Sequence, residues 1–253
     1  MKNYSIGLFD LPSLISVVSC RLAYLACCKA YDFGAGMSVN DYCYIHPDHS
    51  EVLVTNNIFM ISDFKNREDV SSVIIERAVP DKLSKAFEGV SNINKALEYI
   101  SKRNVKSDAF SDLDYFAIKK LNKEINKDKL YLSFIHQMVA GENITGVTDR
   151  YDLDDVNSIS DALHVDRVRY VTGSTFIGGG TELLKKSVGS DFNSEIFSVK
   201  KSFELSNNGD TIKLSAGDII VTKQKLLSDN PIYHMSANSM GKTRYASFVY
   251  SKY

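Results

Sequence analysis

The chain has 253 residues, of which 44% are hydrophobic and 24% are charged. These fractions are ordinary for a globular protein and exclude a mainly disordered, collagen-like or coiled-coil chain. Thirty basic and 31 acidic residues leave a net charge of −1. No overall field would attract nucleic acid or an anionic membrane, so no nucleic-acid partner is expected.

The N-terminal region carries all the cysteines and the most apolar stretch. A disulfide framework would spread its cysteines along the chain, so we predict reduced thiols and a cytoplasmic protein. The apolar stretch Leu11–Ala26 contains Pro12 and Arg21. It is shorter than the roughly 20 residues of a membrane span, so no transmembrane segment is expected and the region reads as a buried helix. The cysteines are Cys20, Cys27, Cys28 and Cys43.

The first half of the chain predicts helices around a few strands. Apolar residues at helical spacing favour helices, and runs of β-formers favour strands. Asn56-Asn57 is typical of a tight hairpin turn. The expected helices are Leu14–Tyr31, Asp81–Lys102 and Ser111–Asn126, and the expected strands lie between Tyr42 and Phe64 and at Lys129–Ile135.

The second half predicts mainly strands. A polar loop at Val139–Asp155 precedes a strand, Val168–Val171, which ends in a glycine-rich turn at 173–180. A helix is expected at Glu182–Val188, followed by strands at Ile196–Leu205, Thr211–Leu214, Asp218–Thr222 and Ala246–Tyr250. No repeat or linker marks a boundary, so residues 1–253 are predicted to form a single mixed-sheet α/β domain with helices packed on the sheet.

The glycine-rich turn is the strongest local signal for chemistry. A strand, a glycine turn and a helix can aim backbone amides at an anion or present a nucleophile. Ser174, Asp218 and His234 follow in the nucleophile, acid and base order of α/β-hydrolases. Such a triad needs an imidazole to activate the serine and a carboxylate to orient the ring. These residues predict a serine hydrolase acting on a small ester or acyl substrate.

The order of segments over roughly residues 20–240 resembles the class 3 (fungal-type) lipase family of the α/β-hydrolases. The resemblance implies an α/β-hydrolase-like fold, with an oxyanion segment near Asn66 and acid and base segments around Asp218 and His234. The segments that carry it are Leu22–Tyr31, Ile58–Asn66, Ala117–Ala140, Val168–Gly179, Ala216–Val221 and Tyr233-His234.

In this register the family's nucleophile elbow falls on Phe134–Val139, which has neither the serine nor the glycines. Either the nucleophile is Ser174, or the chain is a catalytically inactive hydrolase-like scaffold that serves binding or assembly. A third interpretation is a transferase for a nucleotide substrate, with Arg169 and Ser174-Thr175 holding phosphate and ribose.

The remaining histidines give weaker signals. His136 ends an apolar run, where α/β enzymes place functional groups. Cys43-x-x-His46-x-x-His49 has zinc-ligand residue types, but a structural site needs a fourth ligand and the segment also reads as a turn. His164 lies in a charged stretch and is expected at the surface. The sequence therefore predicts no cofactor and no metal site.

Overall fold

The computed structural model describes residues 41–61, 63–102, 112–152, 162–185, 196–227, 231–237 and 243–252. All of them belong to the compact unit Asp41–Tyr253. The helix predicted at Leu14–Tyr31, and Cys20, Cys27 and Cys28, lie outside the described residues. The prediction that residues 1–253 form one domain is therefore not tested and stays a prediction.

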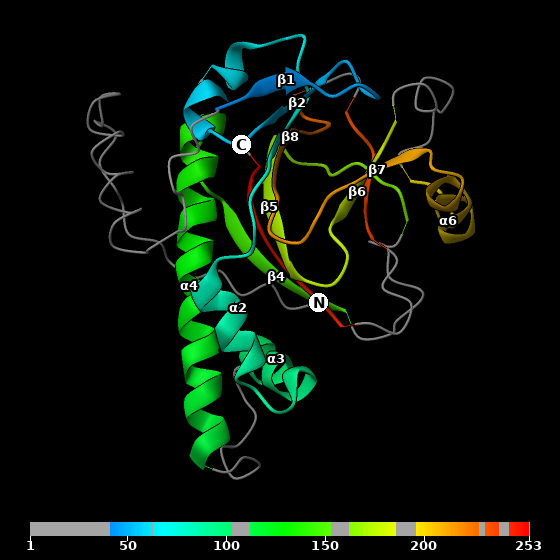
Figure 1. Cartoon of the computed structure of the whole chain (residues 1–253). Coiled ribbons are helices and arrows are strands. Elements are labelled where there is room, and N and C mark those ends of the chain that lie inside the picture. Colours follow the sequence, from blue (N-terminus) through cyan, green and yellow to red (C-terminus); the bar gives the residue numbers. More distant parts are fainter. Residues whose placement is uncertain are drawn as a thin grey trace. The chain divides into compact units, whose positions relative to one another are not determined.

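The described unit is built on two β-sheets (Figure 1). The seven-stranded sheet has the order β1 (Cys43–Ile45), β2 (Val52–Thr55), β3 (Ser72–Ile75), β8 (Ile219–Lys223), β5 (Tyr170–Ile177), β10 (Arg244–Ser251) and β4 (Gly146–Asp152). The three-stranded sheet has the order β7 (Thr211–Lys213), β6 (Thr181–Leu184) and β9 (His234–Ser236).

Almost every strand pair is antiparallel; the parallel pair is β2 with β3. A parallel pair needs a crossover connection, and here residues 56–71 supply it with the 3-10 helices η1 (Ile58–Ile61) and η2 (Phe64–Asn66). The predicted hairpin turn at Asn56-Asn57 is therefore wrong. An α/β-hydrolase is built on a mainly parallel sheet, so the predicted α/β-hydrolase-like fold and the resemblance to class 3 lipases are also wrong.

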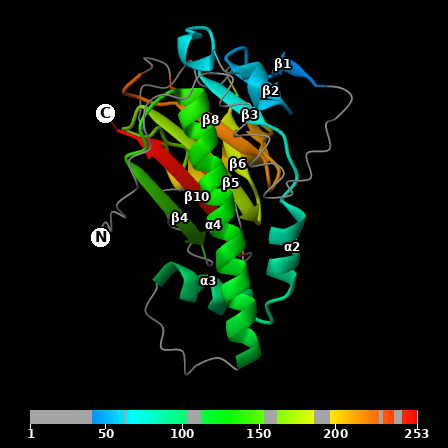
Figure 2. The same ribbon diagram turned by 90° about the vertical axis from the view of Figure 1, so that its left-hand side faces the viewer.

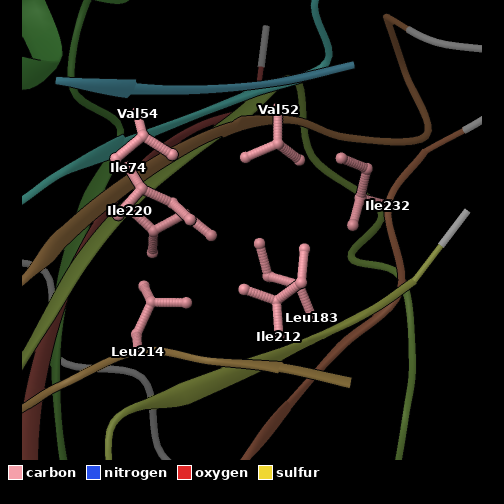
Figure 3. Close-up of a cluster of buried hydrophobic side chains, with 8 residues drawn as sticks. All are labelled: Val52, Val54, Ile74, Leu183, Ile212, Leu214, Ile220 and Ile232. Carbon is pink, nitrogen blue, oxygen red and sulfur yellow. The ribbon is translucent and has the colours of Figure 1, made fainter. Parts of the chain in front are cut away.

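An apolar core fills the space between the two sheets (Figure 3). The seven-stranded sheet contributes Val52, Val54, Ile74 and Ile220, and the three-stranded side contributes Leu183, Ile212, Leu214 and Ile232. Because alternate residues of a strand point to opposite faces, these positions define the inner face of each sheet. The architecture is thus a two-sheet sandwich.

Helices cover the outer faces. The long helix α4 (Asp112–Ala140) crosses the outer face of the seven-stranded sheet, and α2 (Asp81–Glu88) and α3 (Ile93–Lys102) pack beside it (Figures 1 and 2). Helix α6 (Val199–Asn207) lies against the three-stranded sheet. A second apolar cluster on that side consists of Leu163, Leu184, Phe197, Leu205 and Met235.

Helix α4 includes a segment that the sequence predicts to be a strand. The run Lys129–Ile135 is not a strand but the second half of this 29-residue helix. Leu121, Ile125, Leu132 and Ile135 are fully buried at helical spacing, whereas Leu130 is 56% exposed. One side of this apolar run is exposed, so the run forms part of an amphipathic helix and not a strand buried on both faces.

Three other segments differ from expectation. Glu182–Leu184 is in strand β6 rather than a helix, because Leu183 and Leu184 enter apolar clusters on opposite sides of the sheet. Ile196–Leu205 contains helix α6 instead of a strand, and the Ser198 side chain caps it by accepting from the Lys201 amide. The loop expected at Val139–Asp155 contains strand β4. The strands predicted at Thr211–Leu214, Asp218–Thr222 and Ala246–Tyr250 are confirmed as β7, β8 and β10.

The part of the chain described here contains no helix with the length and apolar character that crossing a membrane requires.

Candidate metal centre

Two histidines and one aspartate converge at one place between the sheets. One ligand atom from each of His164, Asp166 and His234 lies within 4.8 Å of the others. The Nε2 atom of His234 is 3.1 Å from Asp166 Oδ2, and Nε2 of His164 is 3.7 Å from Asp166 Oδ1. In the described ranges, this is the one group of three such side chains with the spacing to hold a metal ion.

Backbone pairing brings these residues together although they lie far apart in the sequence. His164 and His234 form an antiparallel bridge in which each amide donates to the other's carbonyl at 2.9 Å. Residues that face each other across an antiparallel pair share one side of the sheet, and their rings lie 4.5 Å apart. His234 is also paired with Leu183, which belongs to the inner core. The site therefore opens on the interior of the sandwich.

The protonation of the cluster suits a cation. Burial, together with the charge of His234, lowers the pKa of His164 to about 4, so this ring is neutral at pH 7. Burial alone would raise the pKa of Asp166, but the hydrogen bond with His234 and the charges of both histidines lower it to about 2. A neutral imidazole and an ionised carboxylate are the forms that bind metal ions.

The hydrogen bonds also fit a bound ion. Nδ1 of His164 lies 2.7 Å from the carbonyl of Ala162, a partner that fixes the proton on Nδ1 and leaves Nε2 free to coordinate. Nδ1 of His234 is buried and has no hydrogen-bond partner within the described part of the molecule. Two histidines and one carboxylate form the facial triad of non-haem iron(II) proteins.

A buried arginine projects into the same interior. Arg244 is on β10, two residues before Ala246, which pairs with Thr175 on the inner side of the sheet. The guanidinium is 1% exposed and donates to the hydroxyl of Thr175 and to the carbonyl of Gly179, each at 3.1 Å. A guanidinium in this setting is a strong site for a carboxylate.

The structure does not assemble the predicted triad. The hydroxyl of Ser174 donates to the carbonyl of Gly217 and accepts from Arg77, on the outer face. The carboxylate of Asp218 accepts from the amides of Arg77 and Ser215, while burial raises its pKa. Neither residue hydrogen-bonds His234, whose side chain meets Asp166 instead. The prediction of a serine hydrolase is wrong, and so is that of a hydrolase-like scaffold.

The glycine segment explains why Ser174 looked like a nucleophile. Strand β5 runs through Gly173 and ends at Ile177, so the turn begins only at Gly178, whose φ is 85°. Gly173 faces the ring of Phe248, which occupies the space that a side chain at Gly173 would need. Gly173 therefore allows β5 to pack closely against β10 and is not part of a nucleophile elbow.

The other predicted positions have structural partners. Arg169 forms an ion pair with Glu142 at 2.7 Å and does not contact Ser174, contrary to the transferase interpretation. His136 is buried against Thr172, with Nδ1 and the hydroxyl 2.9 Å apart. Cys43, His46 and His49 form no metal-binding group among the residues that the structure describes. The ring nitrogens Nδ1 of His46 and His49 instead accept amides within their own turns.

Sequence reasoning placed His164 at the surface, but its side chain is only 16% exposed. The signal that could have found the site is His164-Val165-Asp166, because alternate residues of an extended chain point the same way. The third ligand lies far along the chain, and nothing local marks it.

Comparison with known proteins adds no sequence relative: no family model and no curated protein matches the chain. Among solved structures, the dioxygenase for auxin oxidation 1 from Arabidopsis thaliana, in complex with 2-oxoglutarate, is 10% identical, with a TM-score of 0.38 over 76% of this chain and 86% of that chain. The non-heme iron oxygenase OrfP, in complex with Fe and alpha-ketoglutaric acid, is 10% identical, with a TM-score of 0.38 over 77% of this chain and 79% of that chain. These scores are too low to assign a fold.

Proposed function

We propose that the chain is a non-haem iron(II) oxygenase that uses a 2-oxo acid as co-substrate. The observation that carries the proposal is the convergence of His164, Asp166 and His234 within 4.8 Å. Three protein ligands of these types leave coordination positions open for substrates. An iron(II) ion held there would supply the redox chemistry that couples decarboxylation of a 2-oxo acid to oxidation of a second substrate by O2.

The chain's own residues would bind and orient the reactants. The Asp166 carboxylate provides the negative charge of the site, and the Ala162 carbonyl fixes the His164 ring through Nδ1. The Arg244 guanidinium, held by Thr175 and Gly179, is the candidate for binding a carboxylate of the co-substrate. We choose 2-oxoglutarate, a dicarboxylate, because its second carboxylate would match a guanidinium such as that of Arg244.

The inner core keeps part of the site dry. Leu183 faces His234 across β6 and β9, and it packs with the apolar residues between the sheets. Exclusion of water strengthens electrostatic interactions inside a site and limits side reactions.

We also propose a reducing, cytoplasmic location. Cys43 is a free thiol, and free thiols are typical of such compartments.

The test is anaerobic calorimetric titration of the metal-free protein with Fe(II), followed by titration of the loaded protein with 2-oxoglutarate. We expect one Fe(II) per chain and binding of 2-oxoglutarate that depends on the metal. Asp166→Ala and His234→Ala should each weaken Fe(II) binding by at least about 100-fold, because a ligand is lost. Asp69→Ala, which removes an exposed carboxylate paired with Arg67, is the matched control and should bind like the wild type.

Absence of stoichiometric Fe(II) binding by the folded wild-type protein would contradict the proposal. Binding of iron without binding of 2-oxoglutarate would keep the metal site and exclude the co-substrate.

A further inference from the structure

Two of the three ligands lie on a segment, residues 162–166, that is not part of a regular strand. Amides in such backbone need partners from elsewhere. The Leu163 amide donates to the Ser202 hydroxyl at 2.8 Å, and the His164 amide donates to His234 at 2.9 Å. The Asp166 amide donates to the side-chain oxygen of Gln224 at 2.8 Å. The ligand segment is therefore held by groups from three different elements.

Gln224 is the most constrained of these partners. It follows directly after strand β8 and is fully buried. While its Oε1 accepts the Asp166 amide, its Nε2 donates to the Thr222 hydroxyl at 3.1 Å. The Gln224 amide also donates to the carbonyl of Arg169 at 2.8 Å. One end of the side chain is thus fixed to β8 and the other to Asp166, while its backbone is fixed to Arg169, the residue before β5.

A buried carboxamide is unfavourable unless it is hydrogen-bonded, and an apolar residue of similar size would fill the same volume. The polar groups of Gln224 are used to join the end of β8 to the backbone of Asp166. The neighbouring Lys225 amide donates to the Asp166 carbonyl at 3.3 Å, so Asp166 is held on both sides of its own Cα. Because the backbone of Asp166 is fixed on both sides, its carboxylate is held next to His234.

We propose that Gln224 is a positioning residue of the metal centre, which sets the metal affinity by fixing the backbone of Asp166. The inference rests on the iron site proposed above. Gln224 acts through Asp166 and does not itself bind the ion. Outer partners that orient metal ligands change affinity by about 10-fold to 100-fold when they are lost.

The test measures Co(II) binding to the metal-free full chain by calorimetry, together with the visible absorption of the Co(II) protein, which reports the ligand geometry. Gln224→Met fills the volume without an acceptor, and Gln224→Asn is too short to reach the Asp166 amide. Both should raise the Kd for Co(II) about 10-fold to 100-fold and shift the visible bands. Gln224→Glu retains an acceptor oxygen and should restore the wild-type spectrum.

Ser206→Ala is the matched control, because Ser206 is buried on α6 but is not a partner of the ligand segment. Near-ultraviolet circular dichroism of the metal-free variants checks their folding, and Gln224→Asn carries the test if Gln224→Met does not fold. Wild-type Kd and spectrum in a folded Gln224→Met or Gln224→Asn protein would overturn the inference. Failure of the wild type itself to bind Co(II) would instead refute the metal site.

Discussion

The two faces of the seven-stranded sheet carry similar polar residues and use them differently. Ser174 on β5 points outward to Arg77, whereas the adjacent Thr175 points inward to Arg244. On the outer face, the Arg77 guanidinium makes two hydrogen bonds, of 2.7 and 2.8 Å, to the Asp128 carboxylate. The charges of that pair are matched within the protein itself.

The inner side of the sheet differs because it faces the cluster of His164, Asp166 and His234. There the Asp166 carboxylate lies near the Nε2 atoms of both His164 and His234, which belong to the opposite side of the sandwich. A matched network such as the outer one stabilises the fold. Two imidazoles and a carboxylate that converge within 4.8 Å instead have the residue types and the spacing of a metal site. The distinction comes from geometry, since residue types alone are similar on both faces.

The largest effect should come from the outer face. Asp128→Ala leaves Arg77 without its partner, and the side chains of this pair are 14% and 2% exposed. Removing one partner of a buried ion pair costs about 3–5 kcal/mol. The free energy of unfolding, measured by urea denaturation, should therefore fall by that amount. Fe(II) affinity should not change, because the pair lies across the sheet from the ligands.

The double variant Arg77→Met/Asp128→Leu serves as its control and should be clearly more stable than Asp128→Ala, since no charge remains unpaired. If Asp128→Ala also abolished Fe(II) binding in folded protein, the two faces would not be independent.

His136 gives the outer face a pH dependence of stability. Burial lowers its pKa from 6.5 to about 4. Between these values the unfolded chain binds a proton that the folded chain does not, so stability falls as the pH drops below 6.5. The loss should reach roughly 3 kcal/mol near pH 4.

The measurement for His136 is urea denaturation of the metal-free protein from pH 7 to pH 4. His136→Gln should lose this part of the pH dependence. A wild-type slope in the variant would show that other groups, and not His136, cause it.

The smallest effects should come from the adjacent residues of β5. Ser174→Ala and Thr175→Val each remove one hydroxyl and should each cost about 1 kcal/mol of stability. Only Thr175→Val should also weaken binding of 2-oxoglutarate to the iron-loaded protein, because Arg244 loses the partner that holds its guanidinium. Calorimetry of both variants decides this, and equal affinities would mean that the Thr175 contact does not matter for the co-substrate.

The sequence predicted the elements in which local preference and packing agree. Strands β8 and β10 are rich in β-formers, and Asp81–Lys102 is helical apart from residues 89–92, which separate α2 from α3. The sequence failed to predict strand β6 and the second half of helix α4, because packing against neighbouring elements determines their secondary structure. Leu183 and Leu184 favour a helix by propensity, but cores on both sides of the sheet require a strand.

The candidate site could be predicted only in part. His164 and Asp166 are neighbours in an extended segment, so their common direction could have been recognised. His234 follows Ser174 and Asp218 in the chain order of a hydrolase triad, and this order predicts a different role for it. Its pairing with His164 is a long-range contact between two sheet-forming regions, and no local pattern specifies it.

The bridge between His164 and His234 has a consequence for how the protein matures. Strands β5, β6, β7 and β8 and helix α6 lie between the two histidines in the chain, so the ligands meet only when this long-range contact has formed. A nascent or damaged chain would expose the same three side chains without gathering them. Metal loading would then select for finished molecules, and an incompletely folded chain would not retain a redox-active ion.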